Sequence, residues 1–408
     1  MTQMLKLALR NLGRNRRRSF FSALAMGVAL ALLLLMASVL KGEYGNAIDL
    51  AIRLQSGHLQ IRSESYDEVK NSLKWENLIE NPEQVAAKVA SLGPVVAAAT
   101  PRLYASGFVT TRDNSDPVRV VGIDPLSPAN QPYLEGMQQG QFLTPDDREG
   151  LLLGSTLAHR LGLASGDRVS LSVNTSDGAV DEQPFTVRGI YSTGTAAFDG
   201  STVFLPLAKA QAFTRAGDRA STIFVMLSDT NQTAKVIAAL QAPGYKVLTW
   251  QELNELIVQT EGLAGGYMSF FYLIVLGIAG TVIINTQIMS VYERTREIVI
   301  LAAIGMRGRQ LMSIFLAESG LLAVGGILLG LAIGGAVVMY FTRYGLPLKV
   351  ENFGVTGMLL ANKIYTQLTI KDAVTLTLMT FVVTLLAGLY PAVMASRMEP
   401  VAALRAEK

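Results

Sequence analysis

Four long runs of apolar residues constrain this chain more than any other feature of its sequence. Apart from Glu318, they contain no acidic or basic residue. Each run is long enough for a helix to cross about 30 Å of hydrocarbon at about 1.5 Å of rise per residue. We therefore predict transmembrane helices at residues 19–40, 266–290, 311–341 and 373–395.

The composition indicates a membrane protein that also carries a large polar domain. Half of the 408 residues are hydrophobic and only 16% are charged, a balance between those of soluble and fully embedded chains. The predicted fold class is therefore membrane α-helical, with four transmembrane helices and a large extracytoplasmic α+β domain. The net charge of +3 gives no indication of a nucleic-acid partner. The absence of cysteine excludes disulfides and thiolate chemistry, and two histidines do not favour a metal site.

The N-terminal segment, residues 1–18, carries six basic residues and no acidic one. A cleaved signal peptide is an alternative for the first run, but its 21 apolar residues exceed the usual length, so we predict a retained helix. Apolar residues at Leu5, Ala8, Leu9 and Leu12 predict an amphipathic interfacial helix over 1–18. A basic topology signal without fixed structure is the alternative.

The basic residues also predict the orientation in the membrane. Residues 1–18, the loop 291–310 and the tail 396–408 are all rich in lysine or arginine. Positively charged segments tend to stay in the cytoplasm, so both termini and this loop are expected there. The segments 41–265 and 342–372 are then expected outside.

The outer domain, residues 41–265, is long enough to bury its own core. Strand–helix–strand patterns near its two ends predict a porter-like antiparallel sheet with helices on one face. Short strands and turns predict a β-rich insert at about 124–216 between them. Segments 43–54 and 250–266 are expected to continue helically into the membrane as two stalks.

No enzymatic motif is present. The sequence contains neither a phosphate-binding G-x-x-x-x-G-K-[ST] loop nor an H-E-x-x-H motif. His58 and His159 are predicted to be packing or capping residues. We therefore expect no catalytic, cofactor-binding or metal-binding residues on this chain.

The loop between the second and third runs contains the charged segment "ERTREIVILAAIGMRGRQL", residues 293–311. It predicts a short helix with an apolar face, whose polar side includes Arg294, Glu297 and Arg307. Such a helix needs packing to persist, and it suits the groove of a soluble partner. A solvated connector that only sets topology is the alternative, and the composition leaves both open.

Two features of the third run are notable. Glu318 is expected to reach the membrane surface or a partner rather than to conduct ions. Gly326, Gly330 and Gly334 form a stripe of small residues that permits close helix packing, within one chain or across a dimer.

Three motifs in order resemble FtsX-like ABC transporter permeases of the macrolide-exporter (MacB) and lipoprotein-releasing (LolC/LolE) type. They are "LALRNLGRNRRRSFFSALAMGVAL" at 7–30, the charged loop, and "LYPAVMASRMEPVAALRAE" at 389–407. The segment "LLLGSTLAHRLGLASGDRVSL" resembles the outer domain of the same branch. Val299, Ala302 and Met306 depart from the usual loop pattern, which leaves the identity of the partner in doubt.

This resemblance implies a permease of the bacterial inner membrane that passes motion from a separate cytoplasmic ATPase, which holds ATP and Mg, to the outer domain. Implied partners are that ATPase, a second permease chain in a homo- or heterodimer, a periplasmic carrier or adaptor, and the lipid membrane. Implied clients are lipoproteins or other hydrophobic molecules; activation of cell-wall hydrolases and macrolide or peptide efflux are the alternatives. The implied ATPase-coupling residues are Arg294, Arg296, Glu297, Ile298, Leu301, Ile304 and Gly305.

Overall fold

The computed structural model describes residues 2–66, 73–240, 244–347 and 363–397. The chain divides into two compact units. The helical unit comprises residues 1–45, 260–346 and 363–408, and the sheet unit comprises residues 46–259 and 347–362. Residues 398–408 of the predicted tail and residues 348–362 of the predicted loop lie outside the described residues.

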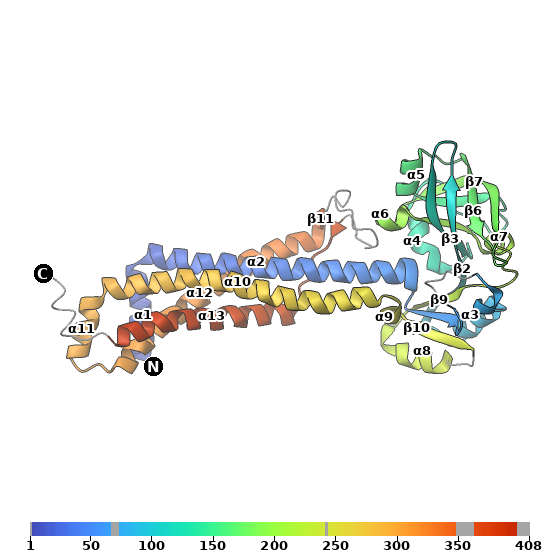
Figure 1. Cartoon of the computed structure of the whole chain (residues 1–408). Coiled ribbons are helices and arrows are strands. Elements are labelled where there is room, and N and C mark those ends of the chain that lie inside the picture. The colour runs from blue at the N-terminus through green and yellow to red at the C-terminus, as the bar shows by residue number, and fades with distance from the viewer. Residues whose placement is uncertain (1, 67–72, 241–243, 348–362, 398–408) are drawn as a thin grey trace. The chain divides into compact units, whose positions relative to one another are not determined.

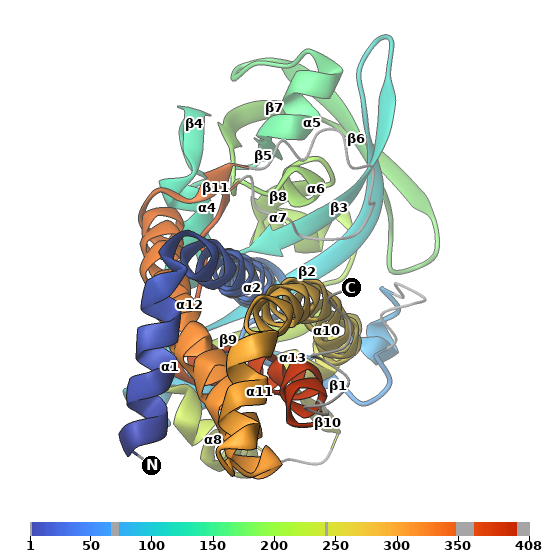
Figure 2. The same ribbon diagram turned by 90° about the vertical axis from the view of Figure 1, so that its left-hand side faces the viewer.

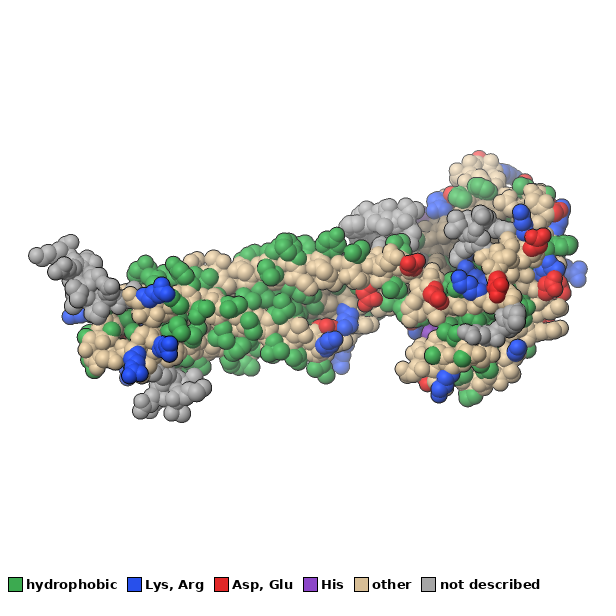
Figure 3. Space-filling view, turned by 60° about the horizontal axis from the view of Figure 1, so that its bottom comes forward, with side chains coloured by type: hydrophobic (Ala, Val, Ile, Leu, Met, Phe, Trp, Pro, Cys, Tyr) green, Lys and Arg blue, Asp and Glu red, His purple; other side chains and the backbone are tan. Residues whose placement is uncertain are grey.

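The helical unit is built around four long helices (Figure 1). Their bounds are α2 (Arg16–Leu50), α10 (Glu255–Glu293), α12 (Gly308–Tyr344) and α13 (Ile370–Ser396). All four are long and apolar enough to cross a membrane. Figure 3 shows hydrophobic side chains along their exposed sides, as a lipid-facing surface requires. The predicted four-helix class is confirmed.

Two shorter helices complete one end of this unit. Helix α1 (Thr2–Arg14) precedes α2 and packs against α12 (Figure 2). Helix α11 (Thr295–Ala303) lies between α10 and α12. A two-stranded sheet of β11 (Leu346–Pro347) and β12 (Lys363–Ile364) precedes α13.

The glycine stripe on α12 packs against α2 of the same chain. A Cβ atom added at Gly330 would lie 2.8 Å from the carbonyl oxygen of Gly27 and 2.8 Å from Cβ of Leu30. Added Cβ atoms at Gly326 and Gly334 would similarly approach Met26 and Ala31 to 2.9 Å. The backbones of the two helices therefore approach each other closely, and the sequence alone left open whether this contact was intramolecular.

The sheet unit contains a ten-stranded sheet in which a six-stranded ring closes on itself. Its strands are β1 (Leu59–Ser63), β2 (Val96–Thr110), β3 (Ser115–Ile123), β4 (Met137–Gly140), β5 (Gly150–Gly154), β6 (Arg168–Asn174), β7 (Val180–Tyr191), β8 (Thr202–Pro206), β9 (Thr222–Leu227) and β10 (Tyr245–Thr249). Its helices include α3 (Pro82–Ala90), α4 (Gln131–Glu135), α5 (Ser155–Leu161), α6 (Ala196–Asp199), α7 (Leu207–Phe213), α8 (Thr233–Leu240) and α9 (Trp250–Leu253).

The antiparallel part follows the order β10-β1-β9-β2, and helices α3 and α8 pack on it through one shared apolar cluster. The ring runs β2-β3-β8-β5-β7-β6 and returns to β2. Its interior is filled by alternating apolar residues such as Leu103, Val120 and Phe185.

The predicted insert at 124–216 does not form a sheet of its own. Strand β2 is 15 residues long, and its second half pairs with β3 on one side and with β6 on the other. The inserted strands therefore complete a barrel with β2 and β3, which lie before the predicted boundary. Closure leaves the ring no unpaired edge, and this explains why the strands join.

The two helical connections leave the sheet side by side. Helix α2 continues as the π-helical turn Ala51–Ser56, which runs into β1, while β10 runs into α9 and then α10. Strands β1 and β10 are antiparallel neighbours, with Leu59 paired to Thr249. Both connections therefore start at adjacent strand ends.

Replacing Gly330 with alanine tests the α2–α12 contact. Because the added methyl group meets backbone and a Cβ atom at 2.8 Å, we expect Gly330→Ala to destabilise the helical unit by about 1–3 kcal/mol. Gly335→Ala is the matched control, since nothing lies within 4 Å of its added Cβ. Thermal unfolding in detergent measures both variants. Equal stability of the two would contradict this packing.

Candidate functional site

The short helix α11 and the side chains that anchor it form the candidate site. The helix begins after Arg294 and ends at Ala303. Gly305 follows with φ of +98°, a conformation that favours glycine, and its N–H and that of Met306 bond back to the carbonyls of Ala302 and Leu301. The C-terminal end of α11 is thus defined by local interactions.

The inner face of α11 packs against the long helices. Ile298 is buried in an apolar cluster with Val291 of α10, Leu311 and Phe315 of α12, and Ala392 of α13. Leu301 and Met306 pack on the edge of this cluster. A helix of nine residues is marginal alone, and this burial supplies the packing it needs.

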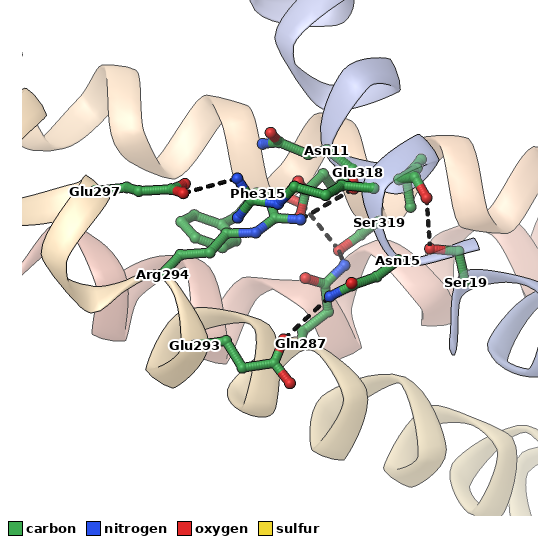
Figure 4. A network of polar contacts seen from close by, with 12 residues as sticks. Asn11, Asn15, Ser19, Gln287, Glu293, Arg294, Glu297, Phe315, Glu318 and Ser319 are labelled. Atoms are coloured by element: carbon green, nitrogen blue, oxygen red, sulfur yellow. Dashed lines mark hydrogen bonds and ion pairs between the residues drawn. The ribbon is translucent and has the colours of Figure 1, made fainter. Parts of the chain in front are cut away.

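A buried ion pair joins the start of α11 to α12 (Figure 4). Nη1 of Arg294 donates to Oε1 of Glu318 at 2.7 Å, and their side chains are only 5% and 3% exposed. Nη2 of Arg294 donates to the carbonyl oxygen of Asn11 in α1 at 3.1 Å. One guanidinium therefore ties α1 and α12 to the junction of α10 and α11.

The neighbouring turns of α12 and α10 are also linked by polar side chains (Figure 4). Nε2 of Gln287 donates to Oγ of Ser319 at 3.3 Å, and Ser319 donates to the carbonyl of Phe315 at 3.1 Å. The Ser319 hydroxyl occupies the space beside Gly388, where an added Cβ would lie at 2.0 Å. The buried network therefore spans α10, α12 and α13.

Exposed ion pairs attach the N-terminal helices to the same site. Nη1 of Arg14 donates to Oε1 of Glu297 at 2.7 Å, and Nη1 of Arg18 donates to Oε2 of Glu293 at 2.7 Å. Asn15 also donates to Glu293, at 3.1 Å. The hydrogen bond from Arg14 lowers the pKa of Glu297, and the same bond raises the pKa of Arg14. These contacts are solvent-exposed, so each contributes little alone.

The outer face of α11 carries apolar and basic side chains with little cover. Ile300 is 50% exposed and Ile304 is 80% exposed. Arg296, Arg307 and Arg309, which are close to them in the sequence, are also exposed. Exposed isoleucines together with exposed arginines are the side-chain types of a protein interface that has an apolar centre and a polar rim.

The structure separates the predicted coupling residues into two groups. Arg296, Glu297, Ile304 and Gly305 are exposed, whereas Arg294 and Ile298 are buried and Leu301 is half-buried. Arg294, predicted on the polar side of the helix, is buried, because its guanidinium turns inward to Glu318. Glu318 is correspondingly buried and paired with Arg294 of the same chain. Sequence reasoning missed this pair because the two residues are 24 positions apart.

The geometry describes a short helix anchored on one face and exposed on the other. Within the part of the chain that the structure describes, no group of three or more His, Cys, Asp or Glu side chains is placed to hold a metal ion. What the site offers is a short rigid helix, fixed to the transmembrane helices on its inner side and free on its outer side.

Comparison with known proteins identifies the class. The model of the MacB-like periplasmic core domain matches residues 19–242, and the model of the FtsX-like permease C-terminal region matches residues 269–400. The first match alone covers more than half of the chain. The chain therefore belongs to the FtsX-like ABC transporter permeases with a MacB-like periplasmic core domain, and its sheet unit is that periplasmic domain.

Relatives of this class align along nearly the whole chain. The lipoprotein-releasing system transmembrane protein LolC of Xylella fastidiosa is 25% identical over 98% of both chains. LolE of Haemophilus influenzae, another transmembrane protein of that system, is 22% identical over 93% of this chain and 92% of its own. The macrolide export ATP-binding/permease protein MacB of Rhodospirillum rubrum is 26% identical over 99% of this chain but 60% of its own length.

The buried ion pair can be tested by removing one partner or both. Glu318→Gln leaves the Arg294 guanidinium buried without a counter-ion, so we expect a loss of about 3–5 kcal/mol in unfolding free energy. Replacing both residues with methionine should recover much of that loss. Arg14→Gln, which breaks an exposed pair, is the control and should change little. Unfolding in detergent measures all three; equal effects of Glu318→Gln and Arg14→Gln would contradict the account.

Proposed function

We propose that this chain is the permease subunit of an ABC transporter whose α11 helix docks on a separate cytoplasmic ATPase. The observation that carries the proposal is the exposed apolar outer face of α11, Ile300 and Ile304, on a helix whose inner side is anchored by Arg294 and Ile298. An anchored helix passes a push to the transmembrane helices instead of yielding to it. ATP and Mg belong to the partner in this proposal.

Helix α1 is bonded to the same anchored helix. Its carbonyl at Asn11 accepts from Arg294, and Arg14 pairs with Glu297 of α11. A force on α11 therefore reaches α1, α10 and α12 together. The long helices α2 and α10 then continue along the chain into β1 and out of β10, which supports transmission of motion to the periplasmic domain.

The client is proposed to be a lipoprotein or another hydrophobic molecule. Support comes from the LolC and LolE relatives, which align over nearly their full lengths. The MacB relative, of which this chain spans 60%, keeps macrolide or peptide efflux as the second candidate. In either case we propose a dimer of permease chains in the bacterial inner membrane and a periplasmic carrier or adaptor.

A charge on the outer face of α11 tests the docking. Ile304→Glu places a carboxylate in the centre of the proposed interface, so we expect at least tenfold weaker association with the ATPase and loss of its stimulation. Leu126→Glu, the same kind of change at a residue that is 77% exposed in the sheet unit, is the control. Co-purification and ATPase assays of the reconstituted complex measure both. If the Ile304→Glu variant stimulated the ATPase as strongly as the wild type does, the loop would be only a connector between helices.

The proposed orientation can be tested by labelling single cysteines, because the natural chain has none. We expect a membrane-impermeant maleimide to label Leu126→Cys in spheroplasts and Ile304→Cys only after lysis. Both side chains are exposed on this chain, at 77% and 80%, and the permease is expressed without its ATPase so that docking does not cover position 304. Labelling of Ile304→Cys before lysis would place α11 outside and end the proposal.

A further inference from the structure

The point where the first helical connection enters the sheet contains an unusual set of contacts. The π-helical turn Ala51–Ser56 ends at Gly57, whose N–H bonds to the carbonyl of Ile52 at 2.8 Å. The last carbonyls of a helix lack intrahelical partners and need donors from elsewhere. Here those donors come from side chains of the sheet unit.

The backbone carbonyls of Leu54 and Gln55 accept these hydrogen bonds. The carbonyl of Leu54 accepts from Oη of Tyr133 at 2.7 Å and from Nη1 of Arg102 at 3.3 Å. The carbonyl of Gln55 accepts from Nε2 of Gln60 at 2.9 Å. The donors lie on α4, β2 and β1, so three elements hold one helix end.

Arg102 is the least expected of these donors. It is 1% exposed, and its Nε and Nη2 atoms have no hydrogen-bond partner. Among the described residues, no acidic side chain forms an ion pair with it. An arginine cannot deprotonate to escape burial, so its charge must be stabilised where it lies.

Two features of this site stabilise the charge. The guanidinium lies 3.5 Å from the ring centroid of Phe224. It also faces the C-terminal end of the helical connection, where the helix dipole is negative. Removing the helix end would leave Arg102 buried with little compensation, so the cation and the helix end stabilise each other.

The donors sit on rigid parts of the unit. Arg102 lies on β2, paired with Ile123 of β3 and Thr222 of β9. Tyr133 is fully buried in an aromatic cluster with Tyr191, Phe198 and Phe204. A displacement of the helix end would therefore reach β2, the strand shared by the barrel and the antiparallel sheet.

We propose that Arg102 and Tyr133 are positioning residues that lock the end of the first helical connection into the sheet, so that the two move as one body. This lock goes beyond the proposed function, because it needs neither an ATPase nor a client. In this proposal, motion of the first helical connection reaches the sheet at the Leu54 carbonyl.

A pair of hydroxyl deletions tests the lock. Tyr133→Phe removes the bond to Leu54, whereas Tyr191→Phe removes a bond to the carbonyl of Thr202 within the same aromatic cluster. The full chain in lipid nanodiscs is followed by hydrogen exchange resolved to residues 51–57. We expect about fivefold faster exchange there in Tyr133→Phe, from one lost hydrogen bond, and no change in Tyr191→Phe.

Arg102→Met is the second variant for the same hydrogen-exchange test. It should accelerate exchange in residues 51–57 at least as much as Tyr133→Phe, while β9 and the barrel strands keep their protection. If Arg102→Met raises exchange across the whole sheet unit, the residue is only part of the core. Equal effects of the two tyrosine variants on residues 51–57, or no effect of Tyr133→Phe, would also overturn the proposal.

Discussion

The buried pair of Arg294 and Glu318 is the interaction on which the candidate site depends. At 2.7 Å and almost without exposure, it fixes the start of α11 to α12, and the second arm of the guanidinium holds α1 through the carbonyl of Asn11. Burying two charges is costly, and the cost is met only while the pair stays intact. A helix too short to persist by itself thereby becomes a fixed part of a four-helix unit.

Close backbone packing is the second constraint on that unit. Lipid offers no hydrophobic drive between helices, so contact area has to come from small residues and shape. The glycines of α12 let its backbone meet Gly27 and Ala31 of α2, and the apolar cluster around Ile298 packs α11 against α10, α12 and α13. The anchoring of α11 and the tight packing of α2 on α12 agree with the proposal that this subunit passes on force.

Within the sheet unit, β2 is the strand that joins the other parts. It pairs with β9 in the antiparallel part and with β3 and β6 in the barrel, and it carries Arg102, which donates to the end of the first helical connection. The antiparallel part and the barrel thus share one strand. This is why a boundary near residue 124, reasonable from turn signals, does not divide the unit.

Much of this architecture was already determined by the sequence. Apolar runs longer than a bilayer is thick have few alternatives to transmembrane helices, and the alternation in β1, β9 and β10 together with the pattern of α3 predicted a sheet with helices on one face. Only the tertiary structure decided that Arg294 turns inward to Glu318, that the glycine stripe meets α2 of the same chain, and that the inserted strands close a ring with β2. The physical reason is common to all three: helical and strand periodicity report which face of an element is apolar, but the partner of that face is chosen by long-range packing, which local sequence does not encode.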